Sequence, residues 1–254
     1  MRPVPNAHFK SPIIVIVDAN SLLIDPMATL DPLDNLVWRA LDTTHSHFRV
    51  GTNLARRYPA DIAPFAALAD SSRKAFTQLE SLLAPNDVVH LIGEKPDAPA
   101  SLEVGLPLDT YQMFAPPHPP PTTHPNVVAL HSKHATEMFD LITLAFPGFY
   151  KSQTYKMGNY FGIRQDGKLI AMAGERLCIP GCHEISAVCT HPGHTGKGHA
   201  RALMLHSMQL HATAGLKSFL HVGQKNTRAV NLYKYMGFQI TNAVTLWPIQ
   251  LRSK

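Results

Sequence analysis

Proline is concentrated in the first half of this chain, and it restricts the possible folds more than any other residue type. Of the 21 prolines among 254 residues, 17 come before residue 126, whereas 12 of the 15 glycines come after it. Six prolines crowd into ten residues, PPHPPPTTHP. Proline lacks an amide hydrogen and fixes φ, so this stretch cannot join a helix or a central strand. We therefore expect a stiff connector at 116–125, between an N-terminal lobe at 1–115 and a second domain at 126–254.

The composition indicates a globular protein with a sizeable core. Hydrophobic residues make up 45% of the chain and charged residues 16%, which excludes disorder or coiled coil along the whole chain. The net charge of +5 is too small to indicate a nucleic-acid binder. The apolar run IIVIV at 13–17 is too short for a signal peptide or a membrane helix, and three cysteines make no even disulfide framework. We expect a soluble, cytoplasmic protein without a nucleic-acid or membrane partner, and the sequence leaves its oligomeric state open.

The N-terminal lobe carries signals of a scaffold. Apolar residues at helical spacing predict helices at 33–48 and 73–84. Runs of apolar residues at 87–94 and 102–106 predict strands. We expect this lobe to be helical with a few strands, and to dock on the second domain.

The second domain alternates strands and helices. The pair Asp166-Gly167 predicts a hairpin within 159–177. Further strands are predicted at 126–131, 183–190, 216–223 and 242–251, and helices at 135–146, 199–215 and 226–238. This order, β-α-β-β-β-α-β-α-β, predicts an α/β fold with a mixed sheet covered by helices.

The most informative segment is the glycine-rich loop THPGHTGKGHA at 190–200, which follows a predicted strand and opens a predicted helix. Its glycines allow a tight turn that brings amide N–H groups close to a ligand. The helix N-terminus adds its positive dipole end, so a diphosphate fits the arrangement. The spacing is neither GxGxxG nor a P-loop. An ordinary strand-to-helix turn is the alternative interpretation.

A second segment, NTRAVNLYKYMGF at 226–238, favours the ligand-binding interpretation over the ordinary turn. It starts with Asn226 at a helix cap and continues to Tyr233 and Gly237-Phe238. With the glycine loop before it, it resembles the GNAT superfamily of N-acetyltransferases. The loop meets the acyl-CoA pattern Q/R-x-x-G-x-G/A in part, because Thr195 stands where Gln or Arg is usual. The strings EISAVCTHP and FLHV look like the subgroup related to glycine N-acyltransferase-like proteins, in which the N-terminal half is often a degenerate, GNAT-like lobe.

The resemblance implies that acetyl-CoA is the co-substrate of an N-acetyltransferase. Backbone groups of Val188, Cys189 and Thr190 would pair with the pantetheine arm, which would splay this strand from the strand at 217–222. Tyr233 would donate a proton to the departing CoA thiolate. The other residues implied in cofactor binding are Thr195, Gly196, Lys197, Gly198, His199, Ala200, Arg201 and Asn226.

The general base stays open between two residues. His221 stands on the strand before the Tyr233 helix, where the resemblance implies a carboxylate, and an imidazole with an ordinary pKa of about 6.5 can accept a proton from an amine. Glu184 shares a strand face with Ser186 and Val188, so it could look into the acceptor cleft. Water alone is the third possibility.

Other features have simpler interpretations. The histidine and cysteine spacings lack the paired geometry of a zinc site, so we expect no metal. Cys189 is a small hydrophobe rather than a nucleophile. The resemblance implies an amine-bearing small molecule or peptide as the acceptor. The aromatic, basic loop at 147–158 favours one with an apolar part and a carboxylate. The alternative to an enzyme is a catalytically silent module that binds acyl-CoA as a sensor or scaffold.

Overall fold

The computed structural model describes residues 33–121 and 126–253, and Asn35–Lys254 forms one compact unit. The apolar run at 13–17 lies outside the described residues. Among the helices that the structure describes, none combines the length and the apolar character needed to cross a membrane.

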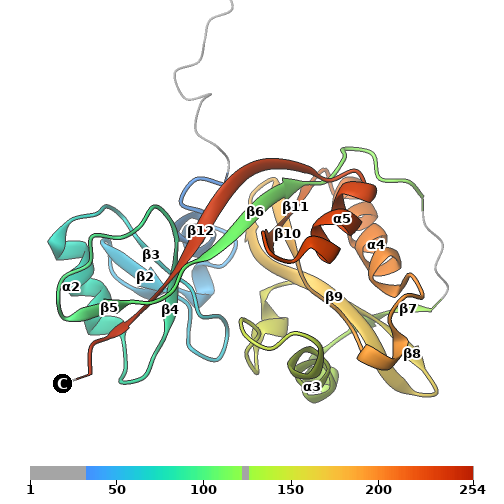
Figure 1. Cartoon of the computed structure of the whole chain (residues 1–254), viewed down its shortest axis with the longest axis horizontal. Coiled ribbons are helices and arrows are strands. Elements are labelled where there is room, and N and C mark those ends of the chain that lie inside the picture. Colours follow the sequence, from blue (N-terminus) through green and yellow to red (C-terminus); the bar gives the residue numbers. More distant parts are fainter. Residues whose placement is uncertain (1–32, 122–125, 254) are drawn as a thin grey trace, which may run out of the picture. The chain divides into compact units, whose positions relative to one another are not determined.

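One large mixed sheet organises this unit (Figure 1). Its strands run in the order β4-β12-β6-β11-β10-β9-β8-β7, and β5 also pairs with β12. The bounds are β4 Val89–Gly93, β5 Leu102–Val104, β6 Leu108–Phe114, β7 Val127–Leu130, β8 Tyr160–Gln165, β9 Lys168–Ile179, β10 Cys182–Thr190, β11 Lys217–Gly223 and β12 Gln239–Leu251. Only β10 and β11 pair in parallel among these named strands.

The predicted hairpin between β8 and β9 is confirmed. Gln165 pairs with Lys168, and the two residues between them turn with φ of 50° at Asp166 and 76° at Gly167. Two positive φ angles match the right-handed twist of a two-residue hairpin, which explains the Asp-Gly pair.

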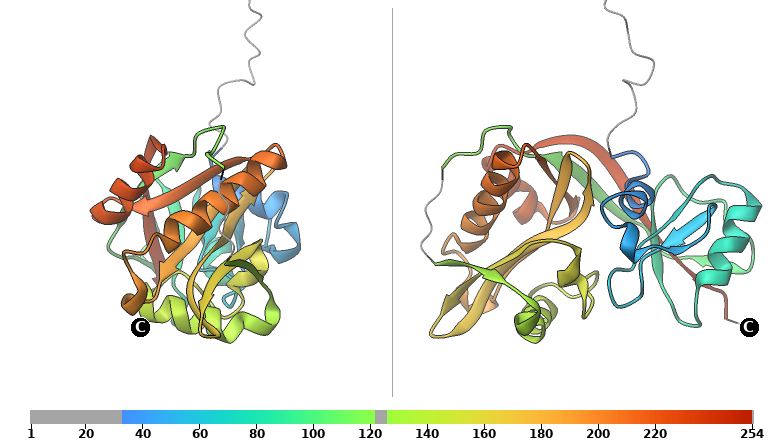
Figure 2. Two further views of the ribbon diagram at one scale, coloured as in Figure 1. Left: turned by 90° about the vertical axis from the view of Figure 1, so that its right-hand side faces the viewer. Right: turned by 180° about the vertical axis from the view of Figure 1, so that it is seen from behind.

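Helices cover both faces of the sheet. Met172 packs in the cluster of α3 (Ala135–Ala145), whereas its neighbours Ala171 and Ala173 pack in that of α4 (His199–Thr213). Successive strand residues point to opposite faces, so α3 and α4 lie on opposite sides of β9 (Figure 2). The last helix, α5 (Thr227–Tyr235), joins α4 in one core cluster. The short 3₁₀ turns are η2 Ser132–His134, η3 Thr154–Met157 and η4 Pro192–His194.

The N-terminal part builds a second, smaller sheet, and its core also includes residues of β4, β5 and β12. The helix predicted at 73–84 is α2 (Arg73–Leu82), which begins at the cap Ser72 and packs with Val89 and Ile249. The helix predicted at 33–48 is shorter than expected. It is α1 (Leu36–Asp42), which ends where the β-branched pair Thr43-Thr44 disfavours another turn. The remaining elements are η1 Ser46–Phe48, β1 Val50–Gly51, β2 Ala55–Arg57 and β3 Ala66–Leu68.

The connector does not divide the chain where we expected. Strand β6 ends just before it, yet β6 lies between β11 and β12 of the main sheet. Strand β12 is long enough to pair with β6 and then with β4 and β5 (Figure 1). The two halves therefore share a sheet, and the boundary at 116–125 falls between strands of that sheet.

This arrangement predicts that residues 126–254 do not fold well alone. Without β6, strands β11 and β12 each lose a partner and expose an unpaired edge, which favours aggregation. We expect this fragment to be poorly soluble or inactive with acceptor, whereas a matched fragment of 106–254, which keeps β6, is more soluble. Sedimentation and circular dichroism of the two fragments check this. A well-folded 126–254 fragment with full activity would contradict it.

Candidate active site

Strands β10 and β11 diverge halfway along their length. They pair only from Cys182↔Lys217 to Glu184↔Phe219. Beyond that point β10 carries a bulge at Ala187, whose φ is 51°. The strand then returns to register with β9, so the edge that faces β11 beyond Glu184 has no partner strand within the described residues. The predicted splay of this strand is confirmed, and it leaves backbone groups of Val188, Cys189 and Thr190 along an open edge.

The glycine loop leads from the end of β10 into α4. Gly196 and Gly198 have φ of 80° and 79°, a left-handed conformation that other residues adopt at a cost. Gly198 is the N-cap of the helix and has no side chain to cover the first-turn amides. The residues from Thr195 to Gly198 are exposed, as is Arg201, while His199 and Ala200 are half-buried. Exposed amides at the start of a 15-residue helix form a place where an anion can bind.

The next helix presents the other two predicted residues. The Oδ1 atom of Asn226 accepts a hydrogen bond from the backbone N–H of Ala229 at 3.2 Å, so its predicted capping role is confirmed. Tyr233 is 9% exposed and packs with residues of α4 and β11, among them Met204 and Val222. Burial raises the pKa of Tyr233 to about 12. The phenol therefore stays protonated at neutral pH and can donate a proton.

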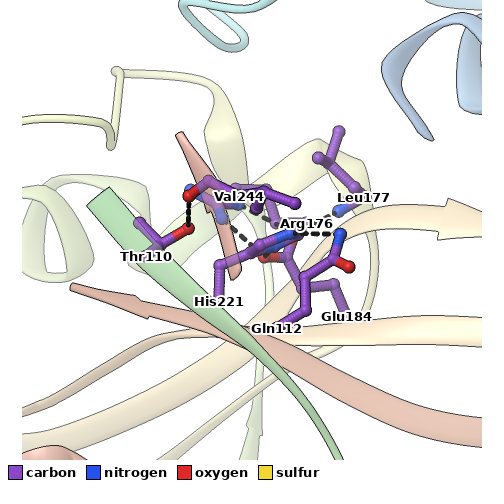
Figure 3. A network of polar contacts seen from close by, with 7 residues as sticks. All are labelled: Thr110, Gln112, Arg176, Leu177, Glu184, His221 and Val244. Atoms are coloured by element: carbon purple, nitrogen blue, oxygen red, sulfur yellow. Dashed lines mark hydrogen bonds and ion pairs between the residues drawn. The ribbon is translucent and has the colours of Figure 1, made fainter. Parts of the chain in front are cut away.

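Glu184 and His221, proposed above as alternative bases, contact each other (Figure 3). The Nδ1 atom of His221 lies 2.8 Å from Oε1 of Glu184. Glu184 also accepts hydrogen bonds from Nε and Nη2 of Arg176, at 2.9 and 2.5 Å, and from the amide of Leu177 at 3.1 Å. Its carboxylate is fully buried and is surrounded by four donors, so it is not accessible to an incoming amine.

These contacts fix which nitrogen of His221 is basic. An ionised carboxylate can only accept, so Nδ1 carries the hydrogen toward Glu184 and Nε2 holds the lone pair. The amide nitrogen of Gln112, on β6, lies 3.0 Å from Nε2 and donates to it. The His221 side chain is 3% exposed. The pair thus resembles an imidazole oriented by a buried carboxylate, with Nε2 as its proton acceptor.

Charge decides the ionisation of Glu184. Burial alone would raise its pKa, but the positive charge of Arg176 and the hydrogen bond from His221 outweigh burial, and the pKa of Glu184 lies well below the ordinary glutamate range. For the thiol of Cys189 burial dominates and raises the pKa to about 12. Cys189 is 5% exposed and protonated, which agrees with its expected role as a small hydrophobe.

Sequence reasoning missed Arg176 and Gln112. Arg176 follows Glu175 in the middle of β9. All the remaining residues from Leu169 to Ile179 are buried and uncharged. A pair of opposite charges inside an apolar strand was a usable signal, because charged residues are rarely buried without partners. Gln112 had no such signal, because β6 itself was not predicted.

A cavity of about 420 Å³ lies beside the loop predicted to face the acceptor. Its lining combines the N-terminal part (Ala60, Asp61) with α3 and the loop after it (Phe139, Ile142, Thr143, Pro147, Gly148, Tyr150, Lys151, Ser152). Tyr150 is 9% exposed, and its hydroxyl has no hydrogen-bond partner among the described residues. A buried hydroxyl without a partner indicates a position that a ligand atom can fill. Tyr150 also packs in the same cluster as Cys189, on the splayed strand.

Comparison with known proteins agrees with this geometry. Residues 116–238 match the Acetyltransferase (GNAT) family. A GNAT family protein from Novosphingobium aromaticivorans is 33% identical, with a TM-score of 0.82, over 88% of this chain and all of that one. A GCN5-related N-acetyltransferase from Kribbella flavida is 14% identical, with a TM-score of 0.61, over 88% of this chain and 97% of that one, and shares the fold. A comparison with curated proteins gave no match.

The ionised Glu184 predicts a pH-dependent stability. The pKa of Glu184 is lowered in the folded chain, whereas an unfolded glutamate titrates near 4.3. At pH values between these two pKa values, the unfolded chain therefore binds more protons than the folded chain. The stability that Glu184 contributes is therefore present above about pH 4.3 and is lost as the pH falls below that value. We expect Glu184→Gln to lower the free energy of unfolding at pH 7 by about 3–5 kcal/mol, because Arg176 keeps an unpaired buried charge.

Urea unfolding between pH 3 and pH 7 measures both effects. The loss of stability on acidification should be smaller in Glu184→Gln than in the wild type, and circular dichroism at pH 7 checks that the variant is folded. Equal dependence on pH in the two proteins would show that folding does not lower the pKa of Glu184.

Proposed function

We propose that this chain, which belongs to the GNAT family of acetyltransferases, moves an acetyl group from acetyl-CoA to an amine by direct attack in a ternary complex. The observation that carries the proposal is the open edge of β10 next to the glycine turn, where the start of α4 has no side-chain cap. An extended pantetheine arm needs backbone partners, and a pyrophosphate needs amide donors. Both are present, in that order along the chain.

In the proposed complex the arm of acetyl-CoA lies along the backbone of Val188, Cys189 and Thr190. The amides from Gly196 to Arg201 hold the pyrophosphate, and Asn226 contacts the cofactor beyond the sheet. Gly196 and Gly198 have left-handed φ angles. These support this placement, because turns of this kind form concave sites whose backbone N–H groups bind anions.

The proposed reaction needs one proton acceptor and one proton donor. An amine loses a proton to Nε2 of His221 and attacks the thioester carbonyl carbon. A backbone N–H of the 188–190 segment holds the resulting oxyanion, and the C–S bond then breaks. The CoA thiolate takes its proton from Tyr233. Most of the acceleration comes from holding the reactants in position.

The contact between Glu184 and His221 supports His221 as the base. Glu184 has four donors and a depressed pKa, so it is a poor proton acceptor. His221 keeps one basic nitrogen, which must exchange its bond with Gln112 for the amine. Glu184 would then be a positioning residue that holds the ring and stabilises the imidazolium.

The cavity beside Tyr150 supports an acceptor with an apolar part. Phe139, Ile142 and Pro147 offer apolar surface, and Lys151 offers a positive charge for a carboxylate. Ala60 and Asp61 line the same cavity, so we infer that the N-terminal part borders the acceptor site. This chemistry suits the glycine N-acyltransferase-like subgroup, which remains a proposal.

One observation favours a silent acyl-CoA-binding module. The His221 side chain is 3% exposed and its basic nitrogen is already hydrogen-bonded to Gln112. A thiol-release assay with acetyl-CoA against amino acids, polyamines and peptides decides between the two functions. Acceptor-dependent release supports the enzyme, and tight acetyl-CoA binding without release supports the module.

Replacing Gly198 by Asp should weaken acetyl-CoA binding. The new carboxylate stands beside the proposed pyrophosphate and repels it, and we expect a loss of about tenfold or more in affinity, equal to about 1.4 kcal/mol. Gly198→Asn is the matched control, because Asn has nearly the same size and tolerates positive φ. Calorimetry on both variants checks this. Equal affinity of the folded Asp and Asn variants would count against the assignment.

Replacing Tyr233 by Phe should lower kcat more than it changes the affinity for acetyl-CoA. The hydroxyl acts only as the thiolate develops, and general acid catalysis contributes about 10²–10⁴-fold. Tyr235→Phe is the control, because Tyr235 ends the same helix and is 79% exposed. Steady-state rates and calorimetry separate the two effects. If chemistry limits the rate and Tyr233→Phe turns over like the wild type, Tyr233 is not the acid.

Replacing His221 by Ala should remove the acid limb of the pH profile of kcat/KM. That limb reports the protonation of the base in the free enzyme. Gln112→Leu is the comparison, because it removes the hydrogen bond to Nε2 of His221 and should keep the limb. A limb that persists in His221→Ala and disappears in Glu184→Gln would make Glu184 the base.

A further inference from the structure

A second buried polar cluster lies on the sheet face opposite the Glu184 pair. It joins Glu175 of β9, His183 of β10 and His211 in the last turn of α4. One ligand atom from each side chain lies within 4.8 Å of the other two. Oε1 of Glu175 is 3.3 Å from Nδ1 of His183 and 2.7 Å from Nε2 of His211. The proposed reaction uses none of these residues.

The three atoms match a known ligand set. Two histidines and a glutamate bind zinc in several enzymes, with bonds of about 2.0–2.2 Å. Ligand atoms around a tetrahedral ion of that size are about 3.3–3.5 Å apart. The spacing between Glu175 and His183 already has this value, and His211 needs to move from Glu175 by less than about 1 Å.

Outer contacts orient two of the ligands. Oγ of Ser218 lies 2.7 Å from Nδ1 of His211. Oε2 of Glu175 accepts hydrogen bonds from the backbone N–H and the side-chain amide of Asn159, at 2.7 and 3.1 Å. A Cβ at residue 158 would overlap the Glu175 side chain, so Gly158 lets the backbone close over the carboxylate. Partners of this kind are typical of metal ligands, because they fix the tautomer and the orientation.

An ion can reach the cluster only from the side of His183. The side chains of Glu175 and His211 are 4% and 1% exposed, whereas that of His183 is 21% exposed. His183 therefore stands at the rim, where an ion could enter and where water could supply a fourth ligand. A transition-metal cation would also neutralise the buried carboxylate.

Hydrogen bonds alone offer a competing account of the cluster. Without a metal, both histidines can donate to Glu175, and the Ser218 hydroxyl then donates to Nδ1 of His211. With a metal, His211 turns its lone pair to the ion and donates from Nδ1 to Ser218. The hydroxyl can play either part, so the same residues satisfy both states and only measurement separates them.

We propose that Glu175, His183 and His211 bind a divalent transition-metal cation, zinc by ligand preference, through Oε1, Nδ1 and Nε2. Bound there, the ion connects β9, β10 and the C-terminal turn of α4, whose other end carries the glycine loop. Its role is structural, because the site lies outside the proposed reaction path. Sequence spacing did not indicate it, because each ligand comes from a different element.

The test uses the full chain, purified without a histidine tag and stripped with a chelator. Equilibrium dialysis against zinc should give about one ion per chain, and zinc should raise the Tm. His183→Ala should weaken binding by more than about 100-fold, and Ser218→Ala by about 10-fold. His206→Ala is the control, because His206 lies on the same helix and outside the cluster, and it should bind like the wild type.

His183 is on the rim, so His183→Ala should fold even if Glu175→Gln or His211→Ala does not. Zinc binding that is far below one ion per chain in the folded wild type would overturn the proposal. The same conclusion follows if His183→Ala binds zinc as tightly as the wild type. In either case the cluster is a hydrogen-bonded network without a metal.

Discussion

The carboxylate of Glu184 sits where the main sheet forks. Glu184↔Phe219 is the last pair before β10 and β11 separate. Its hydrogen bonds reach Arg176 and Leu177 of β9 on one side and His221 of β11 on the other. A buried carboxylate must be satisfied by donors or it costs several kcal/mol. The same contacts therefore hold three strands together at the place where β10 and β11 separate.

The fork also depends on what lies beyond β11. Strand β6 pairs with β11 and presents Gln112 directly opposite His221. Strand β12 then continues past β6 to the N-terminal part. A strand from before the connector thus completes the sheet and supplies a contact to the proposed base. The N-terminal part contributes to the site through the sheet as well as through the cavity.

Two buried carboxylates occupy opposite faces of this region. Glu184 is balanced by the fixed charge of an arginine, whereas Glu175 is surrounded by histidines and an asparagine amide. Burial alone would raise both pKa values. The charge of Arg176, together with hydrogen bonds, keeps the pKa of Glu184 below the ordinary range, and hydrogen bonds do the same for Glu175. A chain with 16% charged residues places two of its few acidic groups in its interior, and their partners decide what each can do.

Local signals in the sequence were enough for the elements around the proposed cofactor site. The Asp166-Gly167 hairpin, the glycine turn at 195–198 and the cap at Asn226 depend on φ angles and contacts within a few residues, so they could be predicted along the chain.

Contacts between distant residues were decided only by the tertiary structure. His221 meets Glu184 across 37 positions and Gln112 across 109, and His211 meets Glu175 across 36. Strand register and sheet order set these distances. They bring the two candidate bases, Glu184 and His221, into contact as one pair. They also place β6 within the main sheet, although the connector after β6 was expected to separate the two halves of the chain.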